Sequence, residues 1–163
     1  MADLTYAPKL HKTDGGDTLV IEAGSKIAAG DATVAAALLT LRTRVVTASV
    51  NAGATLLAAA PGYKYRLVNA FAIAYGGAAG AVTTVDILAT QGASSVKLVA
   101  FAQASLTQSA RLTAGGAGAA ILADGASFAV CDAGTALTIG ITGSAMTTAT
   151  GIDVELQYVL EVA

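Results

Sequence analysis

The chain contains little of the chemistry on which most enzymes and metal sites depend. It has one cysteine, Cys131, so no disulfide can form within the chain. It has one histidine, His11, which excludes a zinc site built from several histidines. Tryptophan is absent, and aromatic residues make up only 5% of the sequence. The apolar side chains are therefore mostly those of alanine and valine, which favour thin, closely packed layers over a bulky core.

Charge is scarce as well. Charged residues make up 12% of the chain, about half the ~25% that is usual in soluble domains. The nine lysines and arginines form no basic stripe, and the formal net charge is -2, so we expect no nucleic-acid partner. Hydrophobic residues reach 55%, and an apolar surface left bare would promote aggregation. This balance predicts an obligate oligomer or a component of a larger assembly.

The length of 163 residues favours one main domain. The first residues, Met-Ala-Asp-Leu-Thr-Tyr, have neither a basic start nor an apolar run, so we expect no secretory signal. The most apolar stretch, residues 67–82, contains Asn69 and falls short of the ~20 residues that a membrane helix needs. We therefore expect a protein made in the cytosol, with no membrane partner.

Two segments alternate with the period of a β-strand. In residues 152–162, apolar and polar side chains alternate almost without exception, so one face is expected to be buried and the other wet. In residues 63–75, three alanines are expected on one face: Ala70, Ala72 and Ala74. The larger side chains are expected together on the opposite, buried face: Tyr65, Leu67, Phe71, Ile73 and Tyr75.

Further strands are predicted over residues 44–50, 54–60, 82–90, 95–102, 128–130 and 137–142, mostly separated by glycine-containing turns. In the 95–102 strand, Val96 and Leu98 are expected opposite Lys97, Val99 and Phe101. No long helical crossovers are apparent. We therefore predict an all-β fold of seven to nine strands, an antiparallel β-sandwich that is jelly-roll-like in a loose sense.

The sequence divides into an N-terminal segment, residues 1–41, and a β-sandwich domain, residues 42–163. Residues 1–18 show no period and indicate an arm, which is either a frayed terminus or an extended segment that orders on a partner. Residues 19–30 contain two short strand signals, compatible with a hairpin or with one or two rungs of a small β-solenoid. Residues 33–41 also allow one or two helical turns, because alanine and leucine favour helix.

No motif in the sequence indicates catalysis. Residues 125–129 approach the G-x-S-x-G nucleophile motif around Ser127, but they lack the final glycine, and no histidine follows. Asp124 and Asp132 are typical of turns, and the glycine-rich segments at 76–80 and 115–118 lack the Lys-Ser/Thr of a phosphate loop. Cys131 is interpreted as a small buried hydrophobic residue. We predict a non-enzymatic protein with no catalytic residue, no cofactor and no metal.

Two regions of the sequence carry the pattern of a known family. The first is Met1-Ala-Asp-Leu-Thr-Tyr6 followed by residues 15–25, and the second comprises residues 122–128, 132–139 and 148–159. These regions resemble the head decoration (capsid cement) and head-fibre proteins of tailed phages. The resemblance implies a homotrimer on the capsid exterior of the virion, which is made in the host cytoplasm and cements neighbouring capsomers of the major capsid protein. It implies no catalytic residues. It assigns capsid contacts to an N-terminal arm: Asp3, Leu4, Tyr6, Pro8 and Leu10. The alanine-dense residues 28–37 depart from the Gly/Ser-rich rungs of such proteins, which argues against a long solenoid.

Two other functions stay open. One is a different structural role in the virion, as a tail, baseplate or fibre module. The other is a carbohydrate-binding β-sandwich, which usually requires exposed aromatic residues. The absence of tryptophan and the expected core positions of Tyr63, Tyr65 and Tyr75 disfavour it.

Overall fold

The computed structural model describes residues 10–12, 19–21, 28–29, 32–33 and 38–163. It divides into two units, Met1–Ala36 and Ala37–Ala163. In the first unit, β1 (Leu10–Lys12) pairs with β2 (Leu19–Ile21), and β3 (Ala28–Ala29) pairs with β4 (Ala32–Thr33), both antiparallel. Of the predicted arm contacts, Leu10 lies in β1. Asp3, Leu4, Tyr6 and Pro8 lie outside the described residues.

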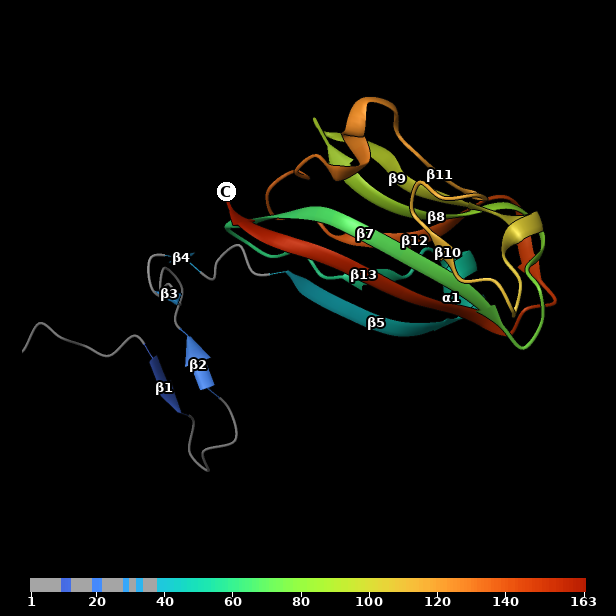
Figure 1. Ribbon diagram of the computed structural model, residues 1–163, viewed down its shortest axis with the longest axis horizontal. Helices are drawn as coiled ribbons and strands as arrows, with labels where there is room; N and C mark the ends of the chain where they lie inside the picture. Colours follow the sequence, from blue (N-terminus) through green and yellow to red (C-terminus); the bar gives the residue numbers. More distant parts are fainter. Residues whose placement is uncertain (1–9, 13–18, 22–27, 30–31, 34–37) are drawn as a thin grey trace, which may run out of the picture. The chain divides into compact units, whose positions relative to one another are not determined.

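The second unit is an antiparallel sandwich of two sheets (Figure 1), which confirms the predicted fold class. The four-stranded sheet has the order β10 (Leu112–Thr113), β7 (Tyr63–Tyr75), β13 (Gly151–Val162), β5 (Leu39–Val46). The five-stranded sheet has the order β11 (Ala119–Ile121), β9 (Ser94–Ala102), β8 (Gly80–Gln91), β12 (Leu137–Thr147), β6 (Thr55–Leu57). Because β5 begins at Leu39, residues 39–41 belong to the sandwich, although the sequence places them in the N-terminal segment.

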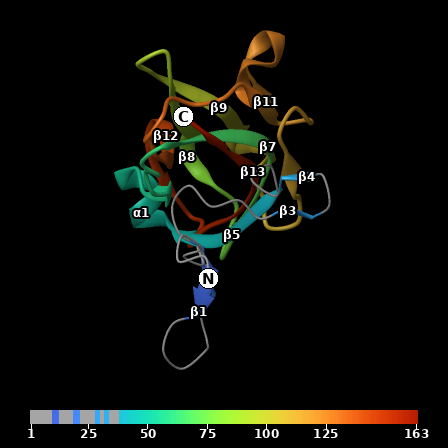
Figure 2. The ribbon, with the colours of Figure 1, turned by 90° about the vertical axis from the view of Figure 1, so that its left-hand side faces the viewer.

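The strands pair in a nested order. The first strand of the sandwich, β5, pairs with the last, β13; β6 pairs with β12; β7 pairs with β10; and β8 pairs with β9. This nesting is the topology of a jelly roll, with β11 added beside β9 as a ninth strand. Figure 2 shows the sandwich turned by 90°, with β9 near the top of the view and β5 near the bottom.

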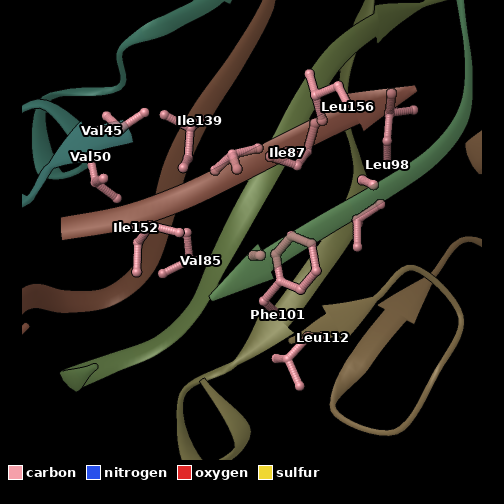
Figure 3. Close-up of a cluster of buried hydrophobic side chains, with 14 of the residues drawn as sticks. Val45, Val50, Val85, Ile87, Leu98, Phe101, Leu112, Ile139, Ile152 and Leu156 are labelled. Carbon is pink, nitrogen blue, oxygen red and sulfur yellow. The ribbon is translucent and has the colours of Figure 1, made fainter. Parts of the chain in front are cut away.

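The core fills the space between the two sheets. One buried cluster joins the two sheets and contains residues that have no solvent contact: Ile152 and Leu156 of β13, Val85 and Ile87 of β8, and Phe101 of β9 (Figure 3). Burial of such side chains contributes roughly 1.5–3 kcal/mol each. The core combines these residues with Ala70, Ala72 and Ala74 of β7.

The segment after β5 differs from the prediction. The sequence predicts a strand over 44–50, but β5 ends at Val46 and a short helix, α1 (Thr47–Ala52), follows. Gly53 ends this helix in the left-handed region, with φ 80, as is common at a helix C-terminus. The helix carries the chain from the four-stranded sheet to β6 of the other sheet. It also places Val50 in the core. The need to change sheets therefore overrides the strand propensity of this segment.

Two more of the predicted strands are shorter or absent. The strand predicted over 54–60 is reduced to β6, Thr55–Leu57. The strand predicted over 128–130 is replaced by a 3-10 helix, η3 (Ala123–Phe128), and a single bridge between Val130 and Arg66. A second 3-10 helix, η2 (Gln103–Ser105), follows β9. Asp124 and Gly125 both adopt positive φ inside η3, which interrupts any extended conformation there.

The predicted face of β7 is wrong beyond its first half. Tyr65 and Leu67 are buried as expected, but Ala70, Ala72 and Ala74 are buried too. The register explains the change: Gln157 faces Asn69 and Tyr158 faces Leu67, so Val68 has no partner on β13. This extra residue is a β-bulge, and it turns the following side chains to the opposite faces. The alanines therefore point into the core, and Phe71, Ile73 and Tyr75 point outward.

A second bulge corrects the prediction for β9. Ile87 of β8 faces Val99, and its neighbour Leu88 faces Lys97, so Leu98 is the unpaired residue. Leu98, Val99 and Phe101 are all buried, whereas Lys97 is exposed. Lys97 therefore does not share a face with Val99 and Phe101.

Candidate functional site

The outer face of the four-stranded sheet carries the most distinctive group of side chains in the sandwich. The bulge at Val68 brings Phe71 and Tyr75 to this face, beside two acidic residues of β13 and two arginines of β5. A third arginine lies immediately before β10. We call this group the arginine face, and define it by seven residues: Arg42, Arg44, Phe71, Tyr75, Arg111, Asp153 and Glu155.

Ion pairs cross the arginine face along the rows of the sheet. Arg44 donates two hydrogen bonds to Asp153, from Nε to Oδ1 at 2.6 Å and from Nη2 to Oδ2 at 2.8 Å. This bidentate pairing is the geometry that a guanidinium and a carboxylate favour. Glu155 Oε2 is shared by two arginines, at 3.0 Å from Arg42 Nε and 3.1 Å from Arg111 Nη2. Three guanidinium groups therefore surround two carboxylates.

Two arginines also lie over aromatic rings. The guanidinium carbon of Arg111 is 3.8 Å from the centroid of the Phe71 ring, and that of Arg44 is 4.1 Å from the centroid of the Tyr75 ring. Such cation–π contacts contribute about 0.5–1 kcal/mol each in exposed positions. The outward aromatic residues therefore hold the arginines in place.

An open hollow of about 500 Å³ lies over these rows, and its lining includes all three arginines and both acids. Arg42 and Arg111 stay largely exposed, with side-chain fractions of 77% and 54%, whereas only 15% of the shared Glu155 is exposed. Positive charge therefore dominates the accessible surface of the hollow. The hydrogen bond from Arg44 lowers the pKa of Asp153, so this pair stays ionised at neutral pH.

The other residues singled out in the sequence have structural roles. The carboxylate of Asp132 accepts hydrogen bonds from the backbone N–H groups of Gly92 and Ala93 at 3.0 and 2.7 Å. It therefore stabilises the two-residue turn between β8 and β9, in which both residues have positive φ. Ser127 is buried; it accepts a hydrogen bond from the N–H of Leu122 and donates one to the carbonyl of Leu98. A buried serine held in this way is unsuited to act as a nucleophile.

Cys131 is buried, and desolvation, with a smaller contribution from the charge of Asp132, raises its pKa to about 11. The ordinary value is 9.0, so the unfolded thiol ionises at a lower pH than the folded one. The folded state then binds more protons between these values. We expect stability to fall as the pH rises from 9 to 11, by up to about 1.4 kcal/mol per pH unit.

Urea denaturation at pH 8.5 and at pH 10.5 measures this loss. Cys131→Ala is the control, because it lacks the thiol and should lose less stability over the same interval. Equal losses in the two proteins would show that Cys131 does not contribute.

The outer face of the five-stranded sheet carries one buried charge, Asp86. Thr142 donates a hydrogen bond from Oγ1 to Asp86 Oδ2 at 2.7 Å, and Lys97 Nζ lies 3.1 Å from the same oxygen. Asp86 Oδ1 and Thr84 Oγ1 are buried without a hydrogen-bond partner. The side chain of Asp86 is only 1% exposed, against 45% for Lys97. This group couples β8 to β9 and β12, and its one carboxylate is already neutralised by the lysine.

No family model, curated protein or solved structure matches the chain. In the part of the chain that the structure describes, no three His, Cys, Asp or Glu side chains are grouped so that they could hold a metal ion. Across those same residues, no helix has both the length and the apolar character to cross a membrane.

Sequence reasoning did not identify the arginine face. The i, i+2 spacing of Arg42 and Arg44 is visible in the sequence, but the predicted strand begins only at residue 44, and Arg111 lies in a segment with weak strand signals. The three meet only because the nested topology places β10 and β5 at the two edges of one sheet. The i, i+2 spacing of Arg42 and Arg44, matched by Asp153 and Glu155 in another strand, was the one usable signal.

Proposed function

We propose that this protein is a structural virion protein that decorates and cements the exterior of a phage capsid, as a homotrimer that bridges capsomers of the major capsid protein. The observation that carries the proposal is the arginine face: an exposed sheet surface with three arginines and two outward aromatic residues, on a stiff sandwich. Arginine and aromatic residues are enriched at the energetic centres of protein interfaces.

The fold is compatible with this role. Jelly rolls recur in viral capsid and lectin domains, although a fold alone does not assign a function. Antiparallel strands joined by many cross-strand hydrogen bonds resist deformation, which suits a protein that holds neighbours under tension. The sequence resemblance to head decoration and head-fibre proteins supplies the specific assignment; it lies in residues 1–6, 15–25, 122–128, 132–139 and 148–159.

Rebinding to phage heads tests the proposal. Purified protein is mixed with assembled heads that lack it, and separately with free capsid subunits, and each mixture is sedimented. We expect the protein to sediment with heads and not to bind free subunits. We also expect Arg42→Gln/Arg111→Gln to bind heads at least about tenfold more weakly, because interface arginines are frequent hot spots.

Lys64→Gln is a control for the loss of positive charge outside the arginine face, because Lys64 lies on β7 of the same sheet. It should bind heads like the original protein. Failure of the unmodified protein to bind heads would refute capsid cementing. Density for the protein at the tail in electron micrographs of intact particles would instead support a tail, baseplate or fibre role.

One observation favours a carbohydrate-binding function as a second candidate. Phe71 and Tyr75 face outward, contrary to the core position predicted for Tyr75. However, the guanidinium groups of Arg111 and Arg44 cover the ring faces on which a sugar would stack. Clear hits on a glycan array that are lost in Tyr75→Ala would support this alternative over cementing.

A further inference from the structure

The outer edge of β5 adjoins the arginine face. In the order of the four-stranded sheet, β5 is the last strand, so one of its edges has no neighbouring strand within the described residues (Figure 1). The strand is eight residues long, and Leu39 and Val46 at its two ends are exposed apolar residues. A long, exposed edge is a template for pairing with another chain, and proteins usually blunt such edges.

The charges on β5 disfavour a second β5 as that partner. If two β5 strands pair antiparallel, their outward side chains must lie on the same face of the joined sheet. Each outward residue of one copy is then opposite an outward residue of the other copy. The registers that pair most of the strand then place Arg42 opposite either Arg42 or Arg44 of the second copy. Like charges directly opposite each other destabilise a sheet. The two arginines therefore protect the edge against self-pairing.

The same charges favour an acidic partner. Arg42 Nε lies 3.0 Å from Glu155 Oε2, and among the ion pairs of the described residues the Arg42 side chain is the most exposed. Arg42 and Arg44 lie two residues apart on one face, so an incoming strand would offer them the side chains of two alternate residues. Carboxylates at those positions would complete the rows in which three guanidinium groups surround two acids.

We propose that β5 accepts an extended segment of another protein, with acidic residues at alternate positions, as an added fifth strand of the four-stranded sheet. Main-chain hydrogen bonds to the edge would supply affinity, and Arg42 and Arg44 would supply specificity, as in other cases of β-strand addition. The identity of the donor rests on the proposed function, under which the segment belongs to the major capsid protein. The strand-accepting edge itself does not depend on that role.

A synthetic peptide tests the edge without the capsid. The probe is an acetylated and amidated eight-residue peptide in which glutamate alternates with valine, labelled for fluorescence anisotropy. The control peptide has glutamine in place of every glutamate. We expect the glutamate peptide to bind at least about fivefold more tightly than the glutamine peptide, and its binding to weaken as salt is raised.

Protein variants locate the site. Arg42→Gln should weaken binding of the glutamate peptide about two- to fivefold, and Arg42→Gln/Arg44→Gln about tenfold, whereas Lys64→Gln should leave it unchanged. Circular dichroism checks that each variant is folded. Bound peptide should also slow amide hydrogen exchange in β5 more than in the other strands of the sheet.

Three results would overturn the inference: equal binding of the two peptides, undiminished binding by the double variant, or binding without protection of the β5 amides. Each of them leaves the head-rebinding test intact, because no head is present here. Conversely, the protein could bind the acidic peptide at β5 and yet fail to bind heads. That result would support the strand-accepting edge and refute the capsid role.

Discussion

Deletion of Val68 is expected to abolish cooperative folding of the sandwich. Val68 is the bulge residue of β7, and it alone allows Tyr65 and Leu67 to share the buried face with Ala70, Ala72 and Ala74. Without it, a continuous strand must turn one of these two sets outward. Loss of Tyr65 and Leu67 from the core costs about 5 kcal/mol or more, which is comparable to the total stability of a typical domain.

The matched control for the deletion is Val68→Ala, which keeps the residue count of β7. The side chain of Val68 is 43% exposed, so the substitution should change the free energy of unfolding by less than about 0.5 kcal/mol. Thermal unfolding followed by circular dichroism compares the two variants. If the deletion variant unfolds cooperatively near the original temperature, the bulge does not determine which side chains are buried.

Replacement of Lys97 by methionine is expected to destabilise the sandwich by about 2–3 kcal/mol. The change leaves the carboxylate of Asp86 buried without its positive partner, and breaking a buried ion pair costs roughly 3–5 kcal/mol. We expect a loss of about 2–3 kcal/mol, below this range, because Lys97 is itself half exposed and water already screens the pair. Urea denaturation of the variant, with Lys64→Met as a surface control, measures the effect.

A double variant separates charge from packing. Asp86→Asn/Lys97→Met removes both charges but retains a side chain of the same shape, which can still hydrogen-bond to Thr142. It should therefore be more stable than Lys97→Met by about 1–2 kcal/mol, because no isolated charge stays buried. If the two variants have the same free energy of unfolding, the loss of stability comes from packing of the lysine stem and not from the charge of Asp86.

The local sequence pattern predicted two long strands correctly. The alternation in residues 152–162 matches β13, and the strand predicted over 63–75 has the bounds of β7. The face of β7 could not be predicted because bulges depend on how two strands pair, and the partner of β7 is 90 or so residues away in the sequence. Both Val68 and Leu98 look like ordinary strand residues, and nothing local marks them as unpaired.

The candidate site was harder to predict than the fold. Its residues come from β5, β7 and β13 and from the segment before β10, so their proximity follows only from the nested strand order. The outward position of Phe71 and Tyr75 depends in addition on the bulge at Val68. The sequence indicated, correctly, an antiparallel sandwich, but one inserted residue, Val68, decided which large side chains of β7 face water.

The pairing of the first sandwich strand with the last has a mechanical consequence. Leu39 faces Tyr158, so the chain enters and leaves the sandwich at neighbouring points on the same side. Force applied between the two ends would open the β5–β13 ladder from that side, one pair of residues at a time, because its hydrogen bonds run across the strands. Force spread over the sheet faces would instead load many bonds together. We therefore expect the sandwich to resist force applied to its sheet faces better than force applied to its chain ends, which would separate β5 from β13.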